Sequence, residues 1–120
     1  MFVRASAEGY RPVLPGIALK TLVHGEKTLL AEFRLARGSV LPRHAHPYEQ
    51  TGYLIAGALD LTVGGETRRV GPGDAWCIPG AVEHSAVVIE DAVAIEVFSP
   101  VRDDYLPREP GSGRFQEDNR

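Results

Sequence analysis

Short runs of aliphatic and β-branched residues, separated by glycine and proline, cover most of the chain. Apolar and polar residues alternate over 59–63, Gly64-Gly65 follows, and strand-forming residues return over 67–70, which predicts a hairpin with a two-residue turn. Further strand-like runs are 29–36, 75–78, 86–89 and 92–98, with Glu90-Asp91 separating the last two. No segment keeps a 3.6-residue period for three turns. The pattern therefore predicts an all-β fold built from many short strands.

The chain of 120 residues has the size of one ordinary domain. We expect a single domain over residues 1–106. From Pro107 onward the sequence holds almost no apolar residues, which predicts a flexible polar tail over 107–120.

The balance of charge argues against two classes of partner. The net charge is −3, so we expect no binding to nucleic acid, which requires clustered positive charge. The longest stretch without charge is residues 50–59, too short to cross a membrane. Arg4 and Glu8 interrupt any apolar run near the first residue, so no signal peptide is expected, and the lone Cys77 fits a reducing compartment. These features predict a cytoplasmic protein.

Three of the four histidines form a candidate metal site. His44 and His46 are two residues apart and would share one face of a strand, while prolines at 42 and 47 argue against a helix there. Together with His84 they could hold a metal ion, because imidazole suits Zn, Fe, Ni, Cu or Mn. The alternative is a pair of exposed histidines at a sheet edge.

The spacing around these histidines resembles the cupin family over roughly residues 30–106. Gly38 precedes His44 by five intervening residues, three residues separate His46 from Gln50, and six separate Gln50 from Gly57. The second motif runs from Gly73 through Pro79 to His84. The resemblance implies a double-stranded β-helix with one divalent metal ion (Ni, Zn, Mn or Fe). Its implied ligands are His44, His46, Gln50 and His84. The chain departs from the family pattern at Gln50, Ala81 and Val88, where the family has glutamate, glycine and asparagine.

Gln50 in place of a glutamate leaves the charge of a bound dication undiminished. This favours Lewis-acid chemistry on an anionic substrate over oxygen chemistry. Glu49 would replace Gln50 as a ligand if the strand were bulged. On a regular strand Gln50 shares the face of the histidines and Glu49 does not, so we favour Gln50.

The run 92–98 is apolar on both faces except for Glu96. This carboxylate either faces water at a sheet edge or lies inside, where it must be paired or used, since an unpaired buried charge is very costly. Ala92 and Ala94 beside it would leave room for a ligand, which favours the interior. A strand of this kind also needs cover on its outer face. Together with the common dimerisation of small cupins, this predicts a homodimer, in which Phe2-Val3 could pair across the interface.

The end of the domain resembles the small pectin-degradation cupins, which linearise unsaturated uronates. The residues that match their catalytic positions are Glu96, Phe98 and Arg102, with glutamate where that group typically has aspartate. The resemblance implies conversion of a small anionic substrate, a 4,5-unsaturated uronate, to a 5-keto-4-deoxyuronate. Glu96 would act as general acid/base, Arg102 would bind the carboxylate, and Phe98 would form an apolar wall. The alternatives are a cupin dioxygenase acting on an enediol or phenolic substrate, and a cupin that binds or senses a small ligand without converting it.

Overall fold

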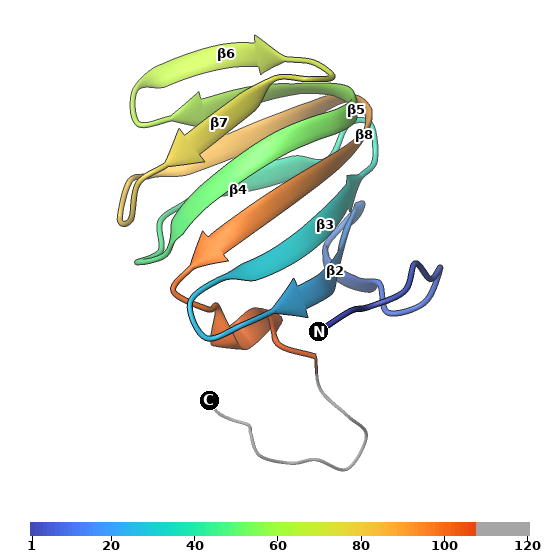
Figure 1. Ribbon diagram of the computed structural model, residues 1–120. Helices are drawn as coiled ribbons and strands as arrows, with labels where there is room; N and C mark the ends of the chain where they lie inside the picture. The colour runs from blue at the N-terminus through green and yellow to red at the C-terminus, as the bar shows by residue number, and fades with distance from the viewer. Residues whose placement is uncertain (108–120) are drawn as a thin grey trace.

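The computed structural model describes residues 1–107, whose regular structure consists of antiparallel strands and one short 3-10 turn (Figure 1). The strands are β1 (Arg11–Leu14), β2 (Ile17–His24), β3 (Leu29–Leu35), β4 (Val40–His44), β5 (Glu49–Val63), β6 (Glu66–Val70), β7 (Ala75–Ile78) and β8 (His84–Ser99). A single 3-10 turn, η1 (Asp103–Tyr105), follows β8. The predicted all-β fold is confirmed. The polar tail expected over 107–120 lies, from residue 108 on, outside the described residues.

The long strands β5 and β8 run through both sheets of the molecule. The first half of β5 pairs with the second half of β8, and this pair is extended by β7 on one side and by β3, β2 and β1 on the other. The second half of β5 pairs with the first half of β8, flanked by β6 and β4. The two sheets enclose the core between them, as expected for a double-stranded β-helix.

Gly57 allows both long strands to bend from one sheet into the other. Its φ is +89°, and a Cβ at this position would lie 2.2 Å from the carbonyl oxygen of Asp91 on β8. The register between β5 and β8 shifts on both sides of this point. The prediction of separate strands over 86–89 and 92–98 is therefore wrong. β8 continues through Glu90 and Asp91, whose side chains are exposed at the bend.

The hairpin predicted around Gly64-Gly65 is present. Gly64 has a φ of +61° and begins the two-residue turn between β5 and β6, a conformation that glycine adopts without strain. The strand expected over 75–78 coincides with β7. Among residues 1–107, no helix is both long and apolar enough to span a membrane.

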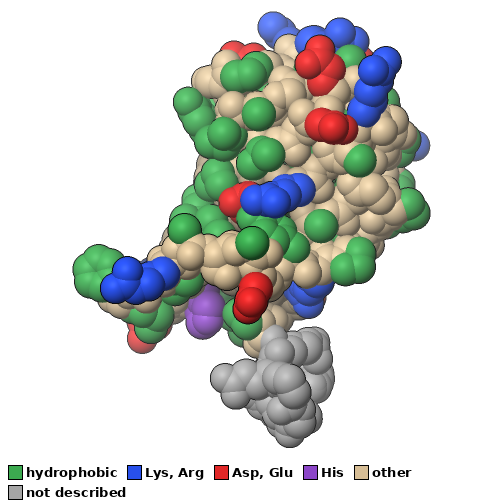
Figure 2. Space-filling model, turned by 90° about the vertical axis from the view of Figure 1, so that its right-hand side faces the viewer, with side chains coloured by type: hydrophobic (Ala, Val, Ile, Leu, Met, Phe, Trp, Pro, Cys, Tyr) green, Lys and Arg blue, Asp and Glu red, His purple; other side chains and the backbone are tan. Residues whose placement is uncertain are grey.

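The outer surface mixes charged and apolar side chains. Figure 2 shows one face on which hydrophobic side chains lie among basic and acidic ones, without a field of a single sign. One sheet contains the first half of β5 and the second half of β8. On its outer face, Tyr53 and Ile55 of β5 are each about half exposed. Ile95 of β8, half-buried, is the register partner of Tyr53. The chain's own strands therefore leave this apolar outer face partly open.

We predict that a second copy of the chain covers this face. Residues 1–10 contain no strand, and Phe2 and Val3 are exposed, so these two apolar side chains remain available to a partner. Light scattering at micromolar concentration should give the mass of a dimer. The double variant Tyr53→Lys, Ile55→Lys should give a monomer, because two desolvated charges would face each other across the interface.

Val87→Lys provides the control, since Val87 is equally apolar and 45% exposed but lies on the half of β8 that belongs to the other sheet. This variant should remain dimeric. A monomeric mass for the unaltered chain would refute the prediction.

Candidate functional site

Three histidines lie together although they come from different parts of the chain. His44 ends β4, His84 begins β8 as its register partner, and His46 lies in the connection to β5. One ring nitrogen of each lies within 4.8 Å of the other two. The expectation that His44 and His46 share a strand is wrong, because β4 ends at His44. The amide of Ala81 donates a hydrogen bond to the His46 carbonyl (2.7 Å) and holds that residue beside the other two.

The backbone sets the tautomer of all three imidazoles. In each ring, Nδ1 lies at hydrogen-bond distance from the carbonyl oxygen of the residue two positions away. A carbonyl oxygen only accepts hydrogen bonds, so Nδ1 carries the proton and Nε2 presents a lone pair. Such a bond is the usual orienting contact of a metal-binding histidine. The pairs are His44 with Pro42 (2.9 Å), His46 with Tyr48 (3.1 Å) and His84 with Val82 (2.9 Å).

The free lone pairs of this cluster fit a metal ion. His84 Nε2 is buried and has no hydrogen-bond partner among the described residues, which is costly for a polar atom. The side-chain oxygen of Gln50 lies 3.0 Å from His46 Nε2, so two acceptor atoms face each other. A cation between them would satisfy both. Neutral imidazole nitrogens with an amide oxygen suit a divalent transition metal.

Gln50 and not Glu49 lies beside the histidines. Gln50 is buried and Glu49 is exposed, as the alternation along a regular strand predicts. The Gln50 amide also reaches the carboxylate of Glu96, to which its Nε2 donates a hydrogen bond. One side chain thus contacts both the histidine cluster and the buried carboxylate.

Glu96 lies inside the molecule, on the face of β8 that also buries Ala94 and Phe98. Its Oε1 accepts hydrogen bonds from Gln50 Nε2 and from Trp76 Nε1 (3.2 Å). Both donors reach the same oxygen, which leaves Oε2 as the atom available to a ligand. Burial raises the pKa of Glu96 to about 7, although the two donors and the positive charge of Arg102 oppose this shift.

Trp76 of β7 holds the Glu96 carboxylate through its indole N–H. It is the register partner of Gly52 on β5, where a Cβ would lie 2.2 Å from the indole ring. The bare glycine lets the indole lie across β5 and point its N–H at Glu96. The pairing of Gly52 with Trp76 could indicate this contact from the sequence, but only once the register between β5 and β7 is known.

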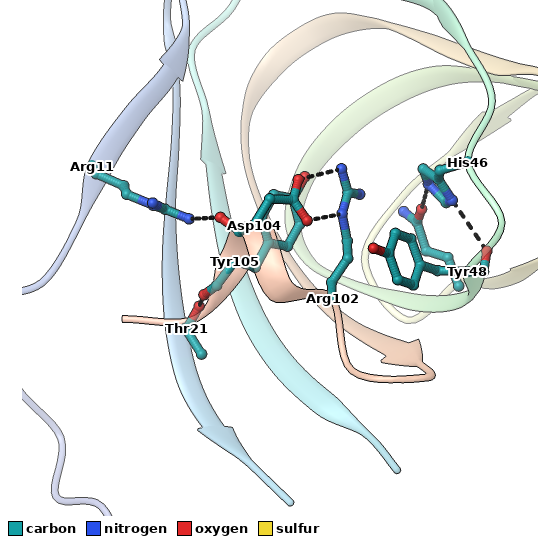
Figure 3. Close-up of polar contacts among 8 residues, drawn as sticks. Arg11, Thr21, His46, Tyr48, Arg102, Asp104 and Tyr105 are labelled. Carbon is teal, nitrogen blue, oxygen red and sulfur yellow. Dashed lines mark hydrogen bonds and ion pairs between the residues drawn. The ribbon is translucent and has the colours of Figure 1, made fainter. Parts of the chain in front are cut away.

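Arg102 and Phe98 lie next to this cluster and to η1. Phe98 is 1% exposed, and its ring centroid lies 6.1 Å from that of His46 and 5.2 Å from that of Tyr105. The guanidinium of Arg102 stacks on Tyr105, with Cζ 3.9 Å from the ring centroid. Its hydrogen bonds go to Asp104, a partner that the sequence did not indicate (Figure 3).

A cavity of about 560 Å³, its open mouth included, connects these groups. The polar residues that line it are His44, Gln50, His84, Glu96, Arg102 and Tyr105, and the remaining wall is almost entirely apolar. A depression in the outer surface shares Phe33, Leu41, His44, Arg102 and Tyr105 with the cavity. The cavity therefore adjoins the outer surface at these residues, and we call this side its mouth. The site therefore brings two opposite kinds of group to one cavity, the imidazole lone pairs and a buried carboxylate.

Known proteins resemble this chain in sequence and structure. The family model described as "Cupin domain" matches residues 31–99. The pectin degradation protein KdgF of Dickeya dadantii (strain 3937) is 30% identical over 93 residues, which are 76% of this chain and 84% of that protein. The structure of KdgF from Halomonas sp. superposes with a TM-score of 0.83 at 36% identity, covering 88% of this chain and 100% of that one.

A more distant structure shares the fold alone. An RmlC-like cupin from Shewanella frigidimarina is 24% identical and superposes with a TM-score of 0.83 over 88% of this chain and 95% of that one.

We predict that the histidine cluster binds one divalent metal ion per chain. Replacing both His44 and His84 by alanine should abolish stoichiometric binding, as measured by elemental analysis and by titration calorimetry. Burial lowers the pKa of His46 and His84, so protons should compete with the metal only below the ordinary histidine value of about 6.5.

The fourth histidine supplies the control. His24 is exposed at the end of β2, and His24→Ala should leave the metal content unchanged. Full metal content in the double variant would show that the ligands lie elsewhere.

The buried Glu96 should make the free energy of unfolding of chelator-treated protein depend on pH. The pKa of Glu96 is raised in the folded state, so the folded chain holds this proton more tightly than the unfolded chain. The contribution of Glu96 to the free energy of unfolding should therefore be fully present below about pH 4.5 and decline by roughly 3 kcal/mol as pH rises through 7. Chemical denaturation at several pH values measures it.

Glu96→Gln isolates this contribution, because His46 and His84, with lowered pKa values, change the stability in the opposite direction. A glutamine keeps an oxygen acceptor for Gln50 and Trp76 and removes the titration. The free energy of unfolding of Glu96→Gln should increasingly exceed that of the unaltered chain as pH rises. Parallel pH profiles would contradict the burial of a titrating carboxylate.

Proposed function

The chain belongs to the cupin family, and from this premise we propose that it is a metal-dependent enzyme that linearises 4,5-unsaturated uronates to 5-keto-4-deoxyuronates. Two observations support the proposal. A relative that covers most of the chain is named a pectin degradation protein. The site also combines a buried carboxylate, lone pairs suited to a cation, and an arginine at the cavity mouth. These are the groups that a small anionic sugar acid requires.

The observation that carries the proposal is the arrangement around Glu96. Oε1 is held by two donors, and Oε2 is left for a ligand in a nearly apolar cavity. Burial raises the pKa of this carboxyl to about 7, where it can both accept and donate a proton near neutral pH.

The proposed reaction is an isomerisation and needs no oxidant. Glu96 Oε2 takes the proton of the hemiacetal hydroxyl of the cyclic substrate. The carbon–oxygen bond that closes the ring breaks, which leaves an aldehyde at carbon 1 and an enol or enolate at carbons 4 and 5. Glu96 then delivers a proton to carbon 4, and the oxygen on carbon 5 becomes a ketone. Substrate and product contain the same atoms.

The other residues bind and orient the substrate. His44, His46, His84 and Gln50 would hold a divalent ion, which as a Lewis acid would polarise a substrate oxygen. Arg102 would bind the substrate carboxylate with the guanidinium donors that face the cavity. Phe98 is buried and lines the cavity together with Glu96, where it would exclude water from the proton transfer.

We predict that Glu96→Gln lowers kcat for an unsaturated galacturonate by roughly 10²–10⁴-fold, the usual contribution of a positioned acid/base. The metal content should not change, because Glu96 is not one of the proposed ligands. Loss of the absorbance of the substrate double bond follows the reaction, and an oxygen electrode monitors the same samples.

Glu49→Gln is the matched control, an identical change at an exposed position of β5. It should turn over substrate at the unaltered rate. Oxygen uptake coupled to turnover would favour the dioxygenase, and tight binding without turnover would favour the ligand-binding cupin. Turnover at the normal rate by Glu96→Gln would remove this residue from the mechanism.

A further inference from the structure

The guanidinium of Arg102 is bound to Asp104 through one of its edges. Nε lies 3.0 Å from Oδ1 and Nη2 lies 3.0 Å from Oδ2, the fork-to-fork pairing typical of arginine and a carboxylate. The side chain of Arg102 is only 13% exposed, whereas that of Asp104 is 56% exposed. The arginine is thus held inside the mouth by an acid that stands outside it.

This pairing leaves the opposite end of the guanidinium free. Arginine has five N–H donors, of which the Asp104 pair uses one on Nε and one on Nη2. Figure 3 shows the guanidinium between Asp104 on one side and His46 on the other. Among residues 1–107, the donors on Nη1 and the second donor on Nη2 have no hydrogen-bond partner and are therefore available toward the histidine cluster, where a substrate carboxylate would lie.

The turn that carries Asp104 is itself fastened to the barrel. Arg11 of β1 donates to the backbone oxygen of Asp104 (2.7 Å), and Thr21 of β2 donates to that of Tyr105. Within the turn, the amide of Tyr105 donates to the carbonyl of Arg102 (2.9 Å). These bonds fix Asp104 relative to two strands of the sheet.

We propose that Asp104 is a positioning residue, which holds the Arg102 guanidinium in the orientation that receives the substrate carboxylate. The proposal rests on the proposed function for the identity of the substrate. Its physical basis is preorganisation: an arginine side chain loses considerable rotamer freedom on binding, and a guanidinium already fixed by Asp104 and Tyr105 has less to lose. Asp104 itself does not touch the substrate.

The test compares Asp104→Asn with Asp103→Asn. Both changes remove one negative charge from η1, but Asp103 is exposed and its side chain forms no hydrogen bond among the described residues. Asp104→Asn should raise KM for the unsaturated galacturonate by roughly 10-fold, as expected for loss of a charged hydrogen-bond pair, and change kcat less than twofold. Asp103→Asn should leave both unchanged. Asp104→Glu, which restores a carboxylate, should recover part of the lost affinity.

Three results would overturn the proposal. A lower KM in Asp104→Asn would make Asp104 a competitor for the carboxylate position. An equal change in Asp104→Asn and Asp103→Asn would reduce the effect to bulk charge. A loss of kcat at constant KM would place Asp104 in the chemical step.

Binding of D-galacturonate, a saturated uronate that cannot undergo the reaction, separates this proposal from the proposed function. Calorimetry measures its affinity for the metal-loaded protein and the two asparagine variants. If the unaltered chain fails to convert the unsaturated uronate but Asp104→Asn alone weakens galacturonate binding, the proposed function fails and the positioning role stands. If the unaltered chain neither converts the unsaturated uronate nor binds galacturonate, the proposed function and the positioning role both fail.

Discussion

A carboxylate and three imidazole lone pairs share the apolar interior of a small barrel, and the placement of the other polar groups follows from pairing them. Gln50 lies at the centre, because its amide contacts His46 with one atom and Glu96 with the other. The orientation of that amide leaves its oxygen, with the imidazole nitrogens, facing the same space. Trp76 completes the pairing of the Glu96 oxygen that Gln50 reaches. The interior thereby presents imidazole lone pairs on one side of the Gln50 amide and the Glu96 carboxylate on the other.

The same division governs the charges at the mouth of the cavity. A neutral glutamine among the proposed ligands leaves Glu96 as the buried acidic residue of the core. Arg102 brings a positive charge to the entrance, and Asp104 offsets part of it without occupying the donors that face inward. A ligand with one carboxylate and several hydroxyl oxygens complements this arrangement. An uncharged ligand would leave the guanidinium donors unpaired.

Residue alternation was sufficient to predict much of the fold and part of the site. It placed Gln50 inward and Glu49 outward, and it grouped Glu96 with Ala92, Ala94 and Phe98, all of which are buried. It failed where the local pattern does not determine the path of the chain. The continuity of β8 depends on Gly57 in another strand, and His46 is fixed by a backbone bond from Ala81. The contacts of Trp76 and Asp104 depend on register and on a short turn, which local sequence does not reveal.

Proton NMR of unsaturated galacturonate in deuterated water, with the metal-loaded protein under nitrogen, tests the central claim most directly. The account predicts that the signal of the proton on the double bond disappears enzymatically and that the linear product carries one deuterium at carbon 4. It also predicts that chelation of the metal stops the conversion. A double-bond signal that decays no faster than in protein-free buffer, or a conversion that requires oxygen, would contradict it.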